Sequence, residues 1–246
     1  MKIIKLDATD STNSFLKELA QNSALEDYTT VITNNQTSGR GQMNNTWLSE
    51  QDKNLTFSVF TKLTNLLIED QAYLNFAVSI ALFRVLNSLS VPNLSIKWPN
   101  DIMSGSHKIC GLLIETTFKK MQIKNTIIGI GLNVNQKEFP SQLSNASSLV
   151  NVCNKQFDLD ELLTKLLNEI KIQIIRIENN ELDNIHKEYQ LSLFRKDIPT
   201  AFKNERNHLL FMGIIKGVST KGNLQIQLED DSIVEYGIKE ISLAKA

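Results

Sequence analysis

Three positively charged side chains stand at positions where they could act on an anionic substrate. Arg40 lies between Gly39 and Gly41. Glycine lets a backbone approach a ligand closely, and arginine offers a forked donor for phosphate or carboxylate. Lys97 ends one apolar run and Lys108 begins another, so a strand would hold each charge in a defined place. A solvated surface loop remains the alternative for the arginine segment, because an isolated Gly-Arg-Gly is weak evidence.

Other polar residues cluster where apolar runs begin or end. Ser11, Thr12 and Asn13 precede a helical run, where these residue types favour an N-cap. The same groups could instead face a polar heterocycle at the start of the helix. Asn100 and Asp101 follow a proline and offer hard oxygen ligands for Mg²⁺ or partners for nucleotide hydroxyls. An ordinary turn at the end of a strand is the alternative for that pair.

Glycines interrupt two strand-like runs at Gly111, Gly129 and Gly131. A glycine inside a strand often marks the close approach of a ligand or of another backbone, and sheet curvature is the alternative. Cys110 lies beside the first of these glycines. We interpret it as a small buried side chain, because no paired base in the sequence suggests a nucleophile.

The common catalytic and targeting motifs are absent from the chain. It has no G-x-x-x-x-G-K-[ST], no G-x-S-x-G, no H-E-x-x-H and no third glycine at the Rossmann offset. In its 246 residues, 26 Lys and Arg stand against 27 Asp and Glu, and this net charge of −1 gives no basic surface for nucleic acid. The N-terminus lacks the apolar core of a signal peptide, and no run approaches the ~18 apolar residues of a membrane span. We therefore predict a soluble, cytoplasmic protein that contacts neither DNA nor membrane.

The elements that must position these side chains follow from apolar spacing. Strands are predicted at 2–7, 28–33, 94–98, 109–118 and 122–134, and helices at 14–21, 71–89, 159–177 and from there to about 193. Leu55, Phe57 and Val59 alternate with polar residues, which predicts a half-buried strand. Residues 34–46 are predicted to form a long loop, and Asp158 to cap the helix that follows it.

This order of elements predicts an α+β fold. The adjacent runs at 109–118 and 122–134 indicate an antiparallel hairpin, so the central sheet should be mixed and packed with helices, not doubly wound. From Ile198 onward, short alternating runs and four glycines predict a small β-barrel or sheet.

Taken together and in this order, these segments resemble the biotin–protein ligases, also called biotin–[acetyl-CoA-carboxylase] ligases. The resemblance covers nearly the whole chain and is carried by Ser11-Thr12-Asn13, Gln36, Gly39-Arg40-Gly41, Trp47, KWPNDI at 97–102, KICGLLIE at 108–115 and GIGLNVN at 129–135. Residues 211–226 are similar to the small SH3-like domain of that family. The resemblance implies a class II synthetase-like catalytic domain over residues 1–195 and an SH3-like domain over residues 196–246.

The resemblance also implies a two-step reaction. ATP and biotin would be the substrates of the first step, which yields biotinyl-5′-AMP and pyrophosphate with Mg²⁺ held mainly by the ATP phosphates. A lysine of a biotin carboxyl carrier protein would then take the biotinyl group. Lys108 would act on the biotin carboxylate, with Arg40 and Lys97 supplying charge around the phosphates. The implied nucleotide residues are Arg40, Gln42, Lys97, Asn100, Asp101 and Asn133, and the implied metal contacts, if any, are Asn100 and Asp101.

The biotin end of the site is implied in the same way. Ser11, Thr12 and Gln36 resemble the residues that bind the ureido ring, and Trp47 resembles a wall of the pocket beside glycines that leave room for the bicyclic ring. The implied biotin-binding residues are Ser11, Thr12, Asn13, Gln36, Gly39, Arg40, Gly41, Trp47, Lys108, Gly111, Gly129 and Gly131.

Two features depart from the best-known form of the family. Many members read G-R-G-R-x-G-R, whereas residues 39–45 here read GRGQMNN, so cations are missing at Gln42 and Asn45. This departure bears on the retention of the adenylate and of pyrophosphate, not on the reaction type. The first motif already begins at Ser11, so we expect a catalytic-domain-only form that lacks the N-terminal DNA-binding domain of some members.

Two rival functions stay open from the sequence. A lipoate–protein ligase or lipoyl transferase shares the resemblance in fold and chemistry, although KWPND and GIGLNVN favour the biotin branch. A non-catalytic biotin or nucleotide sensor would fit the altered loop, but would not need the lysines aimed at phosphate. The sequence also leaves open a monomer or a homodimer, and which carrier protein is the acceptor.

Overall fold

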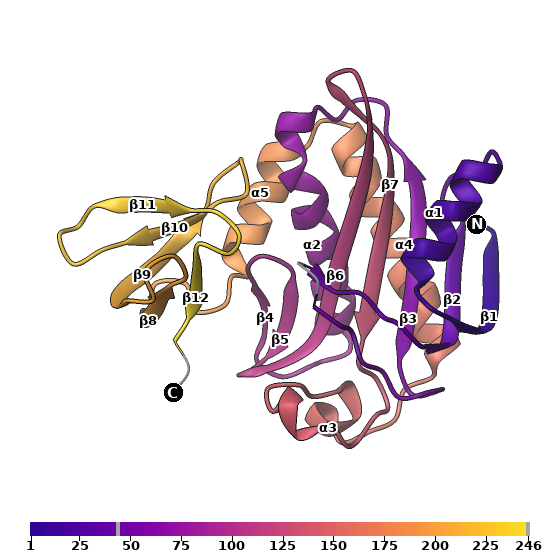
Figure 1. The fold of residues 1–246 in the computed structure, drawn as a ribbon, viewed down its shortest axis with the longest axis horizontal. Coiled ribbons are helices and arrows are strands. Elements are labelled where there is room, and N and C mark those ends of the chain that lie inside the picture. The colour runs from indigo at the N-terminus through magenta and orange to yellow at the C-terminus, as the bar shows by residue number, and fades with distance from the viewer. Residues whose placement is uncertain (43–44, 245–246) are drawn as a thin grey trace.

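The main body of the chain is a seven-stranded sheet (Figure 1). The computed structural model describes residues 1–42 and 45–244. In spatial order the strands are β1 (Ile3–Thr9), β2 (Thr30–Gln36), β3 (Leu55–Lys62), β7 (Gln122–Leu132), β6 (His107–Lys119), β5 (Asp101–Ser104) and β4 (Leu94–Lys97). β1 and β2 pair in parallel, and all other neighbours pair antiparallel. The predictions of a mixed sheet and of a β6–β7 hairpin are therefore confirmed.

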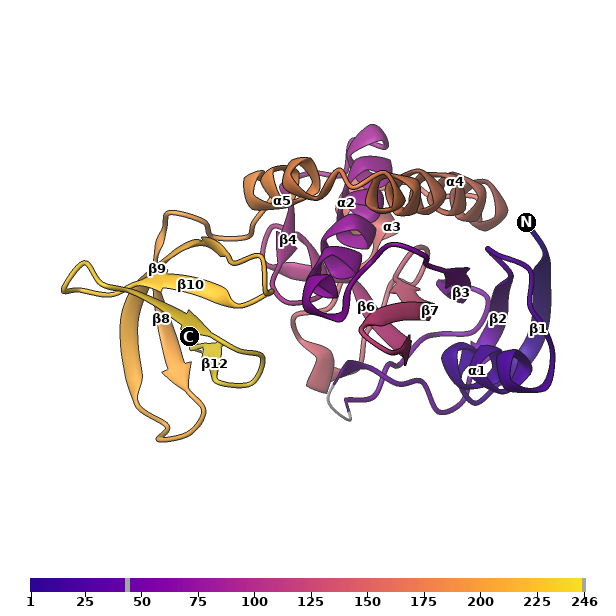
Figure 2. The ribbon, with the colours of Figure 1, turned by 90° about the horizontal axis from the view of Figure 1, so that it is seen from above.

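Helices cover both faces of this sheet, as Figure 2 shows from above. α2 (Ala72–Ser88), α4 (Leu159–Glu178) and α5 (Leu182–Leu191) lie along one face, and α1 (Thr12–Asn22) lies on the other. α2 is apolar around most of its surface, because it packs between the sheet and the two later helices. The predicted cap of α4 is confirmed: the Asp158 carboxylate accepts a hydrogen bond from the Glu161 backbone N–H at 2.8 Å.

Smaller helical segments complete this body. They include α3 (Leu149–Cys153) and the 3₁₀ turns Ile68–Asp70 and Ser141–Leu143. None of the helices that the structure describes is long and apolar enough to cross a membrane.

The C-terminal part of the chain forms a second, five-stranded antiparallel sheet. Its strands, in spatial order, are β11 (Ile233–Tyr236), β10 (Leu224–Gln227), β9 (Leu210–Val218), β8 (Pro199–Asn204) and β12 (Ile241–Leu243). In Figure 1 it stands beside α5 and β4, away from the N-terminus. The predicted change from helices to short strands after residue 198 is confirmed.

The two sheets share one hydrophobic core. Phe202, Ile215 and Ile226 of the second sheet belong to the same buried cluster as the inner face of the first. A hydrogen bond of 2.9 Å from the Trp98 indole N–H to the Gly222 carbonyl adds a polar link. The second sheet therefore has a defined place beside the KWPND segment.

The structure corrects several sequence predictions. β3 is not half-buried, because its polar residues Thr56 and Ser58 are covered as well as its apolar ones. The predicted loop at 34–46 begins only after Gln36, where β2 ends, and its residues 43–44 lie outside the described residues. The turn predicted at 99–101 already contains the first residue of a further strand, β5. A Pro-Asn-Asp sequence hides this strand, since turn-forming residues dominate the local pattern.

Candidate functional site

A cavity of about 350 Å³ lies on the α1 face of the large sheet and reaches toward the second sheet. Because side chains alternate along a strand, Thr56 of β3 and Gly129 and Gly131 of β7 face the cavity. The apolar residues next to them on each strand belong to the core. The predicted site residues that line it are Ser11, Thr12, Asn13, Gln36, Arg40, Gly41, Gln42, Trp47, Asn100, Asp101, Lys108, Gly111, Gly129 and Gly131. Segments from six parts of the chain thus meet in one place.

One end of the cavity is built from uncharged hydrogen-bonding groups at the start of α1. Ser11 is the N-cap, and its hydroxyl accepts from the Ser14 N–H at 3.4 Å. The Thr12 N–H donates to the Gln36 Oε1 at 3.0 Å, which leaves the Gln36 amide N–H₂ to donate elsewhere. The Ser58 hydroxyl lies 2.7 Å from the Thr12 hydroxyl oxygen. These groups are nearly all buried, so any partner they take must form hydrogen bonds.

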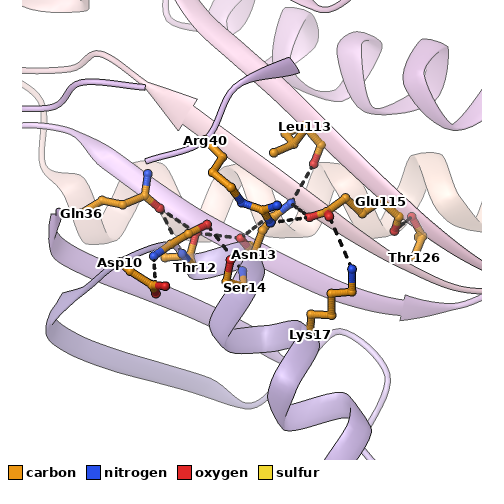
Figure 3. Close-up of polar contacts among 12 residues, drawn as sticks. Asp10, Thr12, Asn13, Ser14, Lys17, Gln36, Arg40, Leu113, Glu115 and Thr126 are labelled. Carbon is orange, nitrogen blue, oxygen red and sulfur yellow. Dashed lines mark hydrogen bonds and ion pairs between the residues drawn. The ribbon is translucent and has the colours of Figure 1, made fainter. Parts of the chain in front are cut away.

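Asn13 connects this end to a charged cluster, drawn in Figure 3. Its side-chain oxygen accepts from Ser58 at 2.6 Å, and its N–H₂ donates to the Leu113 carbonyl at 3.2 Å and to the Glu115 carboxylate at 2.8 Å. The same Glu115 carboxylate accepts from Arg40 at 3.0 Å. Arg40 therefore lies at the cavity but pairs with a carboxylate that the sequence analysis did not single out.

The strand glycines make room for two of the predicted binding side chains. A Cβ on Gly131 would lie 2.3 Å from the Trp47 ring, and one on Gly129 would lie 2.3 Å from the Asn13 side-chain oxygen. Gly111 faces Gly131 across the β6–β7 pair. The Trp47 indole N–H is buried and has no hydrogen-bond partner among the described residues. The glycines thus let an aromatic wall and a polar amide lie directly on the sheet.

The opposite end of the cavity is charged. The Lys108 ammonium lies 2.6 Å from the Asp101 carboxylate and 5.6 Å from the centre of the Trp47 ring. Both side chains are partly exposed, so an anionic ligand can reach the lysine from the cavity. β5 and β6 pair antiparallel with Asp101 opposite Gly111 and Met103 opposite Lys108, and the lysine side chain lies over Gly111 to reach the carboxylate.

The predicted metal contacts supply a single carboxylate. The Asn100 amide N–H₂ donates to the Leu112 carbonyl at 2.6 Å, and Asp101 is already paired with Lys108. Among the described residues, no group of three or more His, Cys, Asp or Glu is placed to hold a metal ion. These side chains alone do not form a Mg²⁺ site, so an ion here would need oxygen ligands from a bound phosphate.

Three predicted site residues do not line the cavity. Lys97 lines a neighbouring, mostly apolar cavity of about 210 Å³ between the two sheets, because it ends β4, the strand nearest the second sheet. Asn133 is buried just beyond the end of β7, where its N–H₂ donates to the Ser147 carbonyl at 2.9 Å. Gly39 is buried beneath Trp47, whose carbonyl oxygen would lie 2.3 Å from a Cβ there.

Other residues at the site were missed by the sequence analysis. Ile238 and Lys239, in the turn before β12, line the cavity from the second sheet. Ser58 and Glu115 hold the predicted residues from strands β3 and β6. Glu115 ends the KICGLLIE segment, which is the one signal that pointed near it. No local sequence pattern identifies the turn with Ile238 and Lys239 as part of the site, since its position there depends on how the two sheets pack.

Cys110 behaves as the sequence suggested. Its side chain is fully buried, and burial raises the pKa of its thiol well above the ordinary value. A thiol with a raised pKa is mostly protonated and is a poor nucleophile.

The fold and the cavity together define a class: an α+β protein whose cavity has buried, uncharged hydrogen-bonding groups at one end and a lysine–aspartate ion pair at the other. The chain matches the profile of the biotin/lipoate A/B protein ligase family over residues 6–133, and it belongs to that family.

Individual relatives agree with this assignment. The chain is 30% identical over 168 residues to the bifunctional ligase/repressor BirA of Bacillus subtilis, a match that covers 67% of this chain and 51% of BirA. It is 28% identical over 175 residues to the biotin–[acetyl-CoA-carboxylase] ligase of Mycobacterium tuberculosis, covering 70% and 63%. The chain thus spans about half the length of the first of these relatives.

A solved structure matches along the whole chain. The biotin protein ligase of Aquifex aeolicus, solved with biotin and ATP, superposes with a TM-score of 0.81 at 27% identity. The match covers 100% of this chain and 99% of that one. The predicted fold class is therefore confirmed.

Proposed function

We propose that this protein is a biotin–protein ligase that activates biotin with ATP and transfers it to a lysine of a biotin carboxyl carrier protein. The observation that carries the proposal is the cavity itself, which joins a buried, uncharged hydrogen-bonding end to a cationic end. Biotin has a neutral ureido ring and a carboxylate tail, so it matches this division. The similarity to ligases solved with biotin and ATP supports the same substrates.

The first step joins two anions. A carboxylate oxygen of biotin attacks the α-phosphorus of ATP, a new P–O bond forms, and the bond to pyrophosphate breaks. Lys108 lines the charged end, where these charges would meet, and Arg40 lines the cavity from its contact with Glu115; the two cations would offset the repulsion and stabilise the charge that develops. The Asp101 carboxylate holds the Lys108 ammonium in place before substrate arrives. Mg²⁺ would enter on the ATP phosphates and add further positive charge.

The ureido ring would lie at the uncharged end. The Gln36 N–H₂ and the Thr12 hydroxyl, which line the cavity, would hydrogen-bond the ring, and Trp47 would form an apolar wall beside it. Ser11 also lines this end, and Asn13 forms its floor. A site with several buried polar groups rejects an analogue that leaves them unpaired, which favours biotin over lipoate.

In the second step the nucleophile is an amine of the carrier protein. The ε-amine of the carrier lysine attacks the acyl carbon of the adenylate, an amide bond forms, and AMP leaves. We assign the synthetic site to residues 1–195 and propose that residues 196–246, whose strands begin at Pro199, act as an SH3-like domain that closes one side of it. Because the reaction consumes ATP and modifies a metabolic carrier, we place it in the cytoplasm.

The remaining nucleotide residues have different places in this scheme. Gln42, Asn100 and Asp101 line the cavity and could contact the ribose or phosphates. Lys97 would act from the neighbouring cavity, and Asn133 would act by supporting the end of β7 through its bond to the Ser147 carbonyl. These two roles differ from direct contact with phosphate.

The test is a reaction of the protein with ATP, Mg²⁺, biotin and a recombinant biotin carboxyl carrier domain, read by intact mass. We expect the carrier mass to increase by one biotinyl group. Adenylate without transfer would mean that another carrier is the acceptor. No adenylate with biotin, but adenylate with lipoate, would favour the rival ligase. Binding of biotin with no exchange of pyrophosphate into ATP would favour a sensor.

A further inference from the structure

Glu115 occupies a junction beside the uncharged end of the cavity. It lies on β6 and does not line the cavity itself, yet its carboxylate contacts two residues that do, Asn13 at 2.8 Å and Arg40 at 3.0 Å. Lys17 of α1 lies 3.9 Å away on the solvent side. Figure 3 shows side chains from α1, from the loop after β2 and from β6 converging here. One carboxylate therefore ties three separate segments together.

We propose that Glu115 is a positioning residue that holds Arg40 over the cavity and Asn13 on its floor, and so sets the affinity for biotin. This inference rests on the proposed function, because it assigns a role within the biotin site. Glu115 would not touch the substrate. It would act through the two side chains that it binds.

The contact with Arg40 fixes the side chain of a segment that is otherwise held through its backbone, by a bridge between Arg40 and Thr46 and by a hydrogen bond of 2.9 Å from the Trp47 N–H to the Gly39 carbonyl. Glycines flank Arg40, so its neighbours offer no side chains for packing. The contact uses one terminal nitrogen of the guanidinium, whereas the group carries five N–H donors. Arginine can therefore stay bound to Glu115 and still offer donors to a carboxylate in the cavity. A fixed guanidinium also loses less entropy when the ligand binds.

The contact with Asn13 fixes which way its amide points. The amide N–H₂ donates to Glu115 and to the Leu113 carbonyl, and the amide oxygen accepts from Ser58. Gly129 lies directly against this amide, and a Cβ there would overlap it. The Asn13 amide, which forms the floor of the cavity, is thus oriented by two acceptors at its nitrogen and one donor at its oxygen.

The substitution Glu115→Gln removes the charge and keeps an acceptor. Asn13 and Arg40 donate to the same carboxylate oxygen, so an amide oxygen there can still accept from Asn13, while Arg40 loses its charged partner. We expect the Kd for biotin, measured by titration calorimetry, to rise about tenfold, the scale of one charge-assisted hydrogen bond. The KM for ATP should change less than about twofold and the Tm by less than about 2 °C, because the fold keeps its packing and a surface ion pair adds little stability.

A double-mutant cycle shows whether Glu115 works through Arg40. Arg40→Gln should also weaken biotin binding, and adding Glu115→Gln to it should change the Kd by less than about twofold, because contacting residues are not additive. Lys17→Met is the matched control, since it alters the charge beside Glu115 without touching either bond. It should leave the Kd for biotin unchanged.

The contrary outcomes are distinct. Additive effects in the cycle would overturn the inference, as would tighter biotin binding by Glu115→Gln, which would mean that Glu115 holds Arg40 away from the ligand. A lower Tm with both KM values rising together would indicate a purely structural role and also overturn it. A wild-type protein that binds no biotin would instead overturn the proposed function, and this inference with it.

Discussion

The two ends of the cavity use opposite means to hold a ligand. At the α1 end, Ser11, Thr12 and Asn13 are 3% exposed and form hydrogen bonds mainly with uncharged groups, although Asn13 also donates to the Glu115 carboxylate outside the cavity. At the other end, Lys108 and Asp101 form a partly exposed ion pair. Buried neutral groups select a shape, because each must find its partner. A charge near solvent attracts many different anions, so it contributes more to the rate of the reaction than to selectivity between substrates. We therefore expect substitutions at the charged end to change rates, and those at the neutral end to change affinity.

The largest effect should come from the charged end. Lys108→Ala should slow adenylate formation by roughly 10²–10³, the scale for removing one key electrostatic donor. Lys108→Arg should not restore the rate, because guanidinium is planar and the wall of Trp47 and Gly111 lies close to the lysine side chain. Single-turnover kinetics would measure both, and a fall of less than about fivefold for Lys108→Ala would contradict the assigned role.

At the neutral end, the wall of the cavity should be sensitive to one carbon. Gly131→Ala puts a Cβ 2.3 Å from the Trp47 ring, so the ring must move. We expect the Kd for biotin to rise about tenfold to 100-fold, since overpacking at a wall costs about 1–3 kcal/mol. Gly237→Ala is the control, because a Cβ there would meet its nearest neighbour at 3.5 Å. Equal effects of the two variants on the Kd would contradict the comparison.

A smaller effect should come from the second sheet. Lys239 is exposed and lines the cavity, so Lys239→Ala should raise the KM for ATP about two- to fivefold, as expected for an exposed charge. The KM for biotin should not change. Lys216→Ala, whose ammonium pairs with Asp197 on the same sheet, is the matched control. An unchanged KM for ATP in Lys239→Ala would mean that this turn does not contact the nucleotide.

The smallest effect concerns the cation missing from the loop after β2. Gln42 lines the cavity, and Gln42→Arg should lengthen the lifetime of bound adenylate by about twofold, because an added charge near solvent contributes little. Release of labelled adenylate measures this lifetime, with Gln42→Met as the uncharged control. An unchanged or shorter lifetime would mean that the charge is compensated elsewhere.

Features that depend on neighbouring residues were predicted well. The cap at Asp158, the long amphipathic α4 and the β6–β7 hairpin follow from local chemistry and spacing. β3 was misjudged, because a polar residue at alternate positions is typical of an exposed face. Here Thr56 and Ser58 face α1 and the cavity instead of solvent. Alternation of polar and apolar residues shows that one face of a strand is polar. It does not show whether that face meets solvent or lines a binding site.

The sequence by itself determined which side chains are available: the lysines, the arginine between glycines, the polar start of α1 and the glycines of β6 and β7. The tertiary structure decided which of them meet. It placed Lys97 in a neighbouring cavity and buried Asn133 beyond the end of β7, and it brought Glu115 and Lys239 to the site. The physical reason is the distance along the chain over which each effect acts, because helix capping and apolar periodicity depend on residues only a few positions apart. The contacts of a cavity depend instead on strand register and on the packing of one sheet against another.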